Sequence, residues 1–258
     1  MKSTVNLIPM AGAGARFFKE GFRDPKSLID IDGKPMVIRA TECLPDADRW
    51  IFVCRKEHLD NYPLAVTLKK AYRGCTILDI DYLSEGQAST CLMAEKYIDL
   101  DNPLLISACD NGIVYNTPKL DTMIRDKAVD ALIFTFRNNA IVARNPKMYG
   151  WVKADDKQRV ERVSVKVPIS DNPMSDHAVV GTFWFRKGEY FIHAAKEMIA
   201  KNTRINNEFY VDECLNNAVA RGLNVKVFEV DKYICWGTPD ELRTFNYWRE
   251  YFNIHKFY

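Results

Sequence analysis

A loop of small residues followed by two cations is the first part of the chain whose residue types suggest chemistry. Residues 10–14, Met-Ala-Gly-Ala-Gly, follow the apolar run Val5–Pro9, and Arg16 and Lys26 come soon after. Such a loop lets backbone N–H groups approach phosphate oxygens closely, and the two cations add charge there. The spacing predicts a site that neutralises a departing pyrophosphate. A tight turn with two solvated cations is the alternative, because a lone G-x-G is a weak signal.

A carboxylate after a buried strand is the second chemical feature. Asp110 follows the apolar run Leu104–Ala108, and side chains at the carboxyl ends of parallel strands face the crevice where open α/β sheets bind ligands. One carboxylate together with substrate phosphates is a common Mg²⁺ site, so Asp110 is the predicted metal ligand. The alternative is a residue that caps the turn. We interpret the neighbouring Cys109 as a core residue.

Alternating strands and helices must position these residues in the first half of the chain. Strands separated by helices predict right-handed βαβ units and a largely parallel sheet. The expected strands are Val5–Pro9, Trp50–Cys54, Thr76–Ile80 and Leu104–Ala108, and the expected helices are Pro35–Leu44, Leu59–Arg73 and Gln87–Tyr97.

The second half has more strands and fewer helices, which predicts a mixed sheet. The expected strands are Ala131–Arg137, Gly150–Ala154, Val160–Val167, Ala178–Phe185 and Asn224–Val230, with helices at Tyr190–Lys201 and Glu208–Arg221 and another beginning near Pro239. We expect one α/β domain over residues 1–258, with an NTP-binding half at about 1–128 and an acceptor-binding half at about 129–258.

Composition excludes several classes of protein. With 36 Lys plus Arg against 34 Asp plus Glu, the net charge is only +2, which argues against nucleic acid as a partner. No apolar run is long enough to span a membrane, and the N-terminal residues resemble a first strand and not a signal peptide. The seven scattered cysteines form no C-x-x-C pair, so we expect reduced thiols in a cytoplasmic protein and no zinc site.

The ordered set of motifs resembles the sugar-phosphate nucleotidylyltransferases, which have a Rossmann-like, glycosyltransferase-A-like fold. The resemblance covers nearly the whole chain. It rests on the glycine-rich loop with Arg16 and Pro25-Lys26, the turn at Glu85–Thr90 and Asp110. In the second half it rests on Tyr149–Val152, Val165–Pro168, Val180–Phe183 and Gly237–Pro239.

The resemblance implies a role for each matching residue. Arg16, Lys26, Asp110 and Lys166 would be catalytic, and Asp110 would bind Mg²⁺. Gly150, Lys166 and Gly181 would contact the acceptor. The NTP would be bound by Met10, Ala11, Gly12, Ala13, Gly14, Arg16, Lys26, Glu85, Gly86, Gln87 and Ala88.

Two positions depart from the family pattern. Many relatives carry an Asp two residues before Gly-Thr-Pro, where this chain has Cys235, so the metal has one protein carboxylate or takes another, such as Asp212 or Asp231. The acid that often precedes the acceptor lysine is replaced by Val165. This second departure concerns which acceptor is used.

These residues predict a nucleotidyltransferase that joins an NTP to a small phosphorylated acceptor. The resemblance implies a role in cell-surface polysaccharide synthesis. A sugar 1-phosphate is the acceptor that the resemblance implies, and CTP is weakly favoured. The first alternative is a cytidylyltransferase for a non-sugar phosphate, such as a phosphorylated amino-acid amide in capsule biosynthesis. A glycosyltransferase of the same fold and a non-catalytic nucleotide-binding regulator are the others.

Other conspicuous residues have structural interpretations. His177 heads a strand and is expected to be a surface or core histidine. The aromatic residues between Phe245 and Phe252 have helical spacing, which predicts a packing face or a homo-oligomer interface. The run Asn206–Asp212 either caps a helix or reaches the acceptor.

Overall fold

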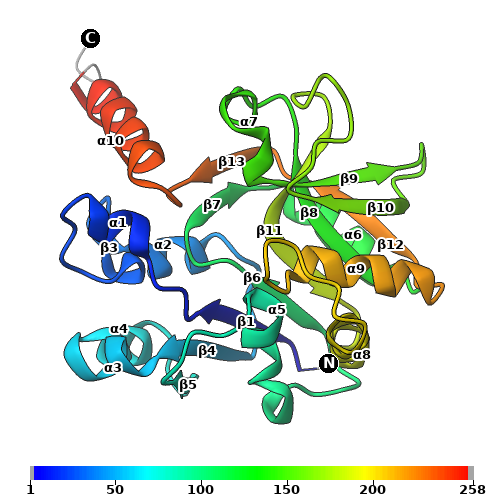
Figure 1. Cartoon of the computed structure of the whole chain (residues 1–258), viewed down its shortest axis with the longest axis horizontal. Coiled ribbons are helices and arrows are strands. Elements are labelled where there is room, and N and C mark those ends of the chain that lie inside the picture. Colours follow the sequence, from blue (N-terminus) through cyan, green and yellow to red (C-terminus); the bar gives the residue numbers. More distant parts are fainter. Residues whose placement is uncertain (1–2, 255–258) are drawn as a thin grey trace.

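The computed structural model describes residues 3–254, and a nine-stranded sheet runs through their centre (Figure 1). Seven strands lie in the order β10-β9-β11-β6-β1-β4-β5, and β8 joins β11 to β12. The strands are β1 Val5–Met10, β4 Arg49–Arg55, β5 Thr76–Ile80, β6 Leu104–Ser107, β8 Ala131–Phe136, β9 Gly150–Ala154, β10 Val160–Val165, β11 His177–Phe185 and β12 Val225–Glu229.

Strand directions divide the sheet into two parts. β1 runs parallel to β4 and β6, and β4 runs parallel to β5. β11 runs antiparallel to β6, β8 and β9 and so joins the parallel part to the second half of the chain. This mixed sheet with flanking helices confirms the predicted α/β fold class.

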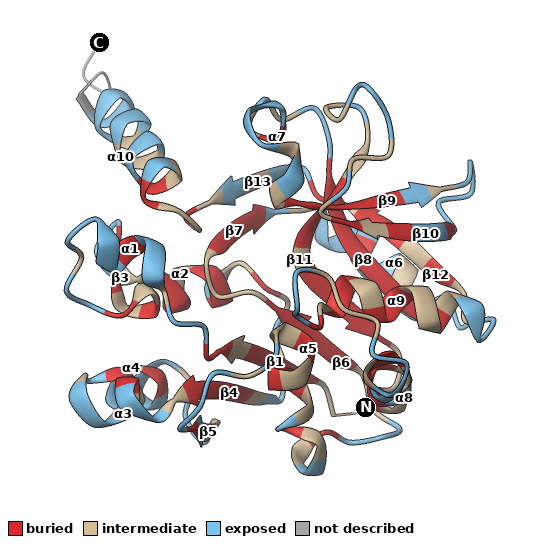
Figure 2. Ribbon diagram, viewed as in Figure 1, coloured by how far each residue is buried: buried red, intermediate tan, exposed pale blue. Residues whose placement is uncertain are grey.

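Two apolar clusters cover the two faces of the sheet. Neighbouring residues of β1 alternate between them: Leu7 belongs to one cluster and Ile8 to the other, as a strand buried on both faces requires. Burial is therefore concentrated in the central strands, while the outer surfaces of the helices are exposed (Figure 2).

The helices are α1 Ala15–Lys19, α2 Met36–Glu42, α3 Lys56–Asn61, α4 Leu64–Ala71, α5 Gln87–Leu92, α6 Thr117–Arg125, α7 Ile141–Arg144, α8 Gly188–Ala200, α9 Val211–Ala220 and α10 Pro239–Ile254. Within residues 3–254, every helix is too short or too polar to cross a lipid bilayer.

Several helix boundaries differ from the sequence predictions. The single helix expected at Leu59–Arg73 is two helices, because Pro63 provides no N–H and the residue before a proline disfavours the helical conformation; Tyr62 is extended. α5 ends at Leu92, and a short 3₁₀ turn replaces the rest of the expected helix. The helix expected from Glu208 begins at Val211.

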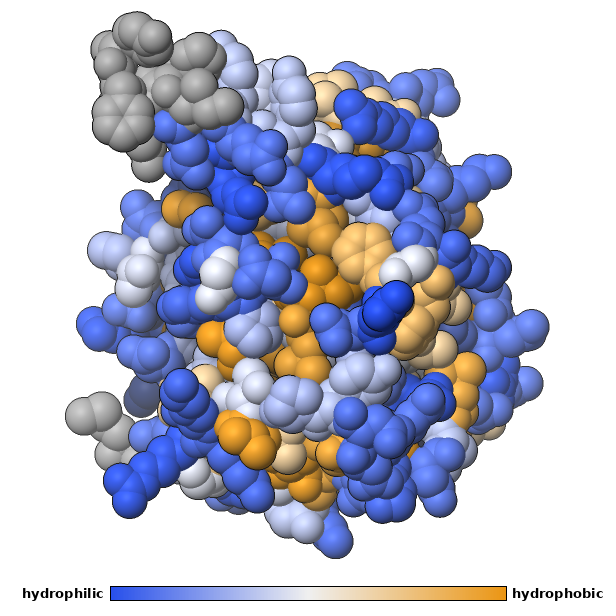
Figure 3. Space-filling model, turned by 90° about the vertical axis from the view of Figure 1, so that its left-hand side faces the viewer, coloured by the Kyte–Doolittle hydropathy of each residue, from blue (hydrophilic) through white to orange (hydrophobic). Residues whose placement is uncertain are grey.

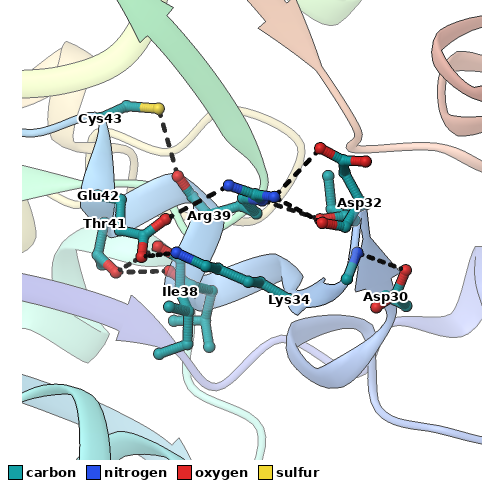
Figure 4. Close-up of polar contacts among 11 residues, drawn as sticks. Asp30, Asp32, Lys34, Ile38, Arg39, Thr41, Glu42 and Cys43 are labelled. Atoms are coloured by element: carbon teal, nitrogen blue, oxygen red, sulfur yellow. Dashed lines mark hydrogen bonds and ion pairs between the residues drawn. The ribbon is translucent and has the colours of Figure 1, made fainter. Parts of the chain in front are cut away.

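A small hairpin, β2 Asp30–Ile31 and β3 Lys34–Pro35, follows the segment that contains Lys26. Its turn has Asp32 and Gly33 at positive φ, as a two-residue hairpin turn requires. Arg39 on α2 fixes the hairpin, donating from Nε to the Ile31 carbonyl at 3.0 Å and from Nη2 to the Asp32 carbonyl at 2.5 Å (Figure 4). The connection from the lysine to α2 is therefore anchored.

A second two-stranded sheet joins distant parts of the chain. β7, Asn111–Val114, pairs antiparallel with β13, Lys232–Cys235. Asp110 lies directly before β7, and Gly237 lies shortly after β13. The pairing therefore brings together two segments that are more than a hundred residues apart in the sequence.

Candidate active site

Two cavities open at the carboxyl edge of the parallel strands. The first has a volume of about 540 Å³ and the second about 220 Å³. Arg16, Gln87 and Asp110 border both, so the cavities adjoin at these residues. The face of the molecule on the side to which β1 points in Figure 1 carries a hollow with apolar residues at its centre and hydrophilic residues around it (Figure 3).

The loop after β1 forms one wall of the first cavity. Its two glycines, Gly12 and Gly14, have different surroundings. A side chain built on Gly12 would meet no atom within 4 Å, so its backbone faces open space. Gly14 has φ +63° and directly precedes α1, and a Cβ there would lie 3.5 Å from Cβ of Lys26. The loop thus leaves its backbone accessible to a ligand and holds Lys26 beside it.

Lys26 and Asp110 form an ion pair where the cavities meet. The lysine Nζ donates to the Asp110 carboxylate at 2.5 Å and to the Gly237 carbonyl at 2.9 Å. Burial disfavours charge on both groups, but their attraction outweighs it, so the pKa of Asp110 is lowered and the pKa of Lys26 is raised. Both side chains are therefore charged at neutral pH, and each is neutralised by the other.

The turn before α5 is held against the segment before α9. Gly86 has φ +110°, and a Cβ there would lie 2.6 Å from both N and O of Phe209, so only glycine fits. The Phe209 N–H donates to the Glu85 carbonyl at 2.7 Å, and the Ala88 N–H donates to the Phe209 carbonyl at 2.9 Å. Glu85 points outward to Arg204 at 3.0 Å. Gly86 and Gln87 border the first cavity, whereas Glu85 and Ala88 border neither.

The second cavity contains the predicted acceptor residues Gly150, Lys166 and Gly181. Lys166 donates to the Met148 carbonyl, and its Nζ lies 5.5 Å from the centre of the Tyr210 ring. Burial, reinforced by the charge of Arg16, lowers the pKa of Lys166. A Cβ on Gly150 would lie 2.3 Å from Oδ2 of Asp212, so a larger residue there would displace that carboxylate.

Further acids border the second cavity, and the motif comparison missed one of them. Asp212 is 7% exposed, and burial raises its pKa to about 6. Glu241, which the sequence reasoning missed, accepts hydrogen bonds from Cys235 Sγ at 3.0 Å and from Thr238 Oγ1 at 2.9 Å. The T-x-x-E capping pattern that begins α10 was the available signal. Asp231 borders a separate cavity with Arg137 and Glu229.

Where the two cavities adjoin, the protein side chains can bind a magnesium ion only together with ligands from a substrate. Within residues 3–254, no three His, Cys, Asp or Glu side chains are grouped to hold a metal. Mg²⁺ is commonly bound by one or two carboxylates plus substrate phosphates and water. A Cβ built on Gly237 would lie 3.2 Å from Oδ2 of Asp110 and 3.6 Å from Oε2 of Glu241, so both carboxylates lie close to Gly237. Such a site fits the chemistry that Mg²⁺ needs.

A protein-family model and several solved structures are similar to this chain. Residues 5–250 match the family model described as nucleotidyl transferase. A nucleoside-diphosphate-sugar pyrophosphorylase from Vibrio cholerae shares the fold with TM-score 0.73 and 20% identity over 93% of this chain and 98% of that one. The inositol-1-phosphate CTP transferase from T. maritima shares it with TM-score 0.72 and 15% identity over 95% of each chain. A search of curated proteins returned no match. At these identities the solved structures establish the fold, while the family model spans nearly the whole chain. The chain therefore belongs to the nucleotidyl transferase family and is an enzyme of that class.

Proposed function

We propose that this nucleotidyltransferase transfers the nucleotidyl group of an NTP to a small phosphorylated acceptor and releases pyrophosphate. The observation that carries this proposal is the pair of adjoining cavities with Arg16 and Asp110 at their junction. The first contains the glycine loop and Lys26, which suit a triphosphate. The second contains Lys166, which suits the acceptor phosphate.

In the proposed reaction an oxygen of the acceptor phosphate attacks the α-phosphorus of the NTP. A new bond forms between that oxygen and the α-phosphorus, and the bond from the α-phosphorus to the pyrophosphate oxygen breaks. Lys166 orients the acceptor phosphate, which needs no general base because it is already an anion. Arg16 and Lys26 stabilise the charge that develops on the α-phosphate and on the leaving pyrophosphate. Positioning and electrostatic stabilisation then provide the rate enhancement.

Lys26 must leave Asp110 for this chemistry to occur. In the structure the lysine neutralises the carboxylate that we assign to the metal. Mg²⁺ bound there would add positive charge where the phosphates meet and would screen their negative charge from the attacking oxygen. We infer that Lys26 moves from the carboxylate to the phosphates when nucleotide binds.

A sugar 1-phosphate is the acceptor we propose, for nucleotide-sugar formation in cell-surface polysaccharide synthesis. A pyrophosphorylase of nucleoside-diphosphate sugars shares the fold and supports this choice. A non-sugar phosphate used in capsule biosynthesis is the second candidate, because Val165 and Cys235 depart from the family pattern. CTP is the favoured NTP, and a CTP transferase with this fold lends it some support. The seven free thiols support a cytoplasmic location.

A substrate screen tests the proposal. The protein is incubated with Mg²⁺, each of ATP, GTP, CTP, UTP and dTTP, and a panel of sugar 1-phosphates and non-sugar phosphates. Pyrophosphate should appear only with particular pairs. Sugar transfer from a nucleotide sugar, with no pyrophosphate from any pair, would replace the proposal with a glycosyltransferase. Tight NTP binding without turnover across the panel would indicate a regulator.

A further inference from the structure

His58 is a cavity residue that the proposed reaction does not use. It lies in α3, which begins directly after β4, and it borders the first cavity. The residue is only 6% exposed, and its ring contacts the edge of Tyr62 with centres 6.4 Å apart. A buried histidine therefore forms part of the wall of the proposed nucleotide cavity.

One nitrogen of the imidazole lacks a hydrogen-bond partner among the described residues. Its Nδ1 is buried and has no partner among residues 3–254. A buried polar group without a partner destabilises the folded state. Burial, together with the nearby charge of Arg55, lowers the pKa of His58, so the ring is neutral at pH 7 and has one donor and one acceptor nitrogen. The other buried side-chain atom without a partner in this part of the chain is Nε1 of Trp236, which does not border the cavity.

The order of the strands indicates which part of a nucleotide would meet this ring. Asp110 follows β6 and His58 follows β4, and these strands lie on opposite sides of β1. The two residues therefore begin about 10 Å apart across the sheet edge. The acceptor cavity lies on the side of β6 and β11. A nucleotide with its α-phosphorus at Arg16 and Asp110 must extend its base away from the acceptor, towards β4 and β5.

Other side chains that border the first cavity include two paired hydroxyls and an exposed apolar group. The hydroxyls of Ser84 and Thr90 bond each other at 2.5 Å, and the Thr90 hydroxyl lies 3.0 Å from the Gly86 carbonyl. Leu83 is 62% exposed and offers an apolar surface for stacking. His58 thus stands out among these side chains as the polar group that lacks a partner.

We propose that the imidazole of His58 hydrogen-bonds the edge of the nucleobase and sets which NTP the enzyme accepts. This inference rests on the proposed function, since it assigns the base to the first cavity. A neutral imidazole discriminates because bases differ in the order of donors and acceptors along their edges. A base that presents the wrong group would leave both partners unpaired, and such a mismatch lowers affinity by about tenfold or more.

His58→Leu tests the proposal, because leucine fills similar space without polar atoms. Binding of the five NTPs and of inorganic tripolyphosphate is measured with Mg²⁺ by calorimetry, together with thermal unfolding of the ligand-free protein. We expect at least a tenfold loss of affinity for the preferred NTP and a smaller spread among the five. Tripolyphosphate has no base, so its affinity should be unchanged. The melting temperature should stay the same or rise, because an unpaired buried nitrogen has been removed.

Three results separate this inference from the proposed function. A variant that keeps the wild-type preference and affinity would overturn the role of His58. Equal losses for NTP and tripolyphosphate, with a lower melting temperature, would also overturn it by showing a structural role. A wild-type enzyme that discriminates among bases through His58 but releases no pyrophosphate with any acceptor would support the inference and contradict the proposed reaction.

Discussion

At the scale of single residues, the ion pair between Lys26 and Asp110 leads to the first prediction. Asp110→Asn removes the carboxylate that we assign to Mg²⁺ and deprives Lys26 of its ion-pair partner. Metal-dependent pyrophosphate release should be abolished, while circular dichroism should show an intact fold. Near-normal turnover in Mg²⁺ would make Asp110 a turn residue.

Lys26→Ala should separate two proposed roles of the lysine, which are to stabilise the departing pyrophosphate and to neutralise Asp110. Without its ammonium group the departing pyrophosphate loses a stabilising charge, and kcat should fall by about 10²–10³ with little change in the acceptor KM. The same change frees Asp110, so Mn²⁺ titrated without nucleotide should bind more tightly than to wild type. Lys34→Ala is the control, since Lys34 pairs with Glu42 away from both cavities. Unchanged kcat in Lys26→Ala would return Lys26 to the role of a surface cation.

Asp212 makes a prediction about pH. Burial raises its pKa to about 6, from roughly 4 in an unfolded chain. The raised pKa stabilises the fold below about pH 4, and this contribution is lost as the pH rises through 6. Asp212→Asn stays neutral, so at pH 8 it should be more stable than wild type by roughly 2–3 kcal/mol. Denaturant unfolding should show the difference shrinking towards pH 4.5, and a less stable variant at pH 8 would disprove it.

At the scale of elements, the turn before α5 depends on Gly86. Gly86→Ala would place a methyl group 2.6 Å from the Phe209 backbone, at a φ that alanine avoids. The contact between this turn and the segment before α9 should break, with a lower melting temperature and weaker NTP binding. Gly74→Ala is the matched control, because Gly74 also has positive φ but an added Cβ meets nothing within 4 Å. Equal effects of both variants would show that only backbone strain matters.

The sequence predicted the apolar strands well and could not predict pairing between distant segments. The strands β1, β4, β5 and β6 are largely apolar and were recognised within two residues at each end. β7 and β13 are four residues each and pair across more than a hundred positions, so neither run contains the information that joins them. The same applies to Glu241, whose local role is to cap α10 and whose place beside the second cavity depends on that pairing.

The sequence could name candidate residues where a motif was present. The glycine loop, Lys26 and Asp110 were named from residue type and order, and Lys166 from the family resemblance; the structure places all of them beside the two adjoining cavities. His58 could not, since a single histidine in an ordinary helix has no pattern. Its proposed role depends on a cavity lined by segments from many parts of the chain.

At the scale of the whole molecule, α10 extends from the body of the protein (Figure 1). Tyr247, Trp248 and Phe252 are 63%, 49% and 61% exposed. Exposed aromatic groups of this kind are typical of association sites, so the expected homo-oligomer should use this helix. Light scattering should give a multiple of 29.8 kDa, and Trp248→Ser with Phe252→Ser should shift it to the monomer. A wild-type monomer at micromolar concentration would contradict this prediction.

The pairing of β11 with β6 also has a consequence for how the chain is made. Ser107 is matched by Thr182, so one edge of β6 has no partner until about 75 further residues have been synthesised. At about 5–20 residues per second, this delay is roughly 4–15 s. During that time the nascent first half exposes an unpaired, buried-type strand, the kind of edge that other chains can join. Slow translation through this stretch should therefore promote aggregation, and a fragment that ends near residue 128 should require a chaperone to stay dissolved.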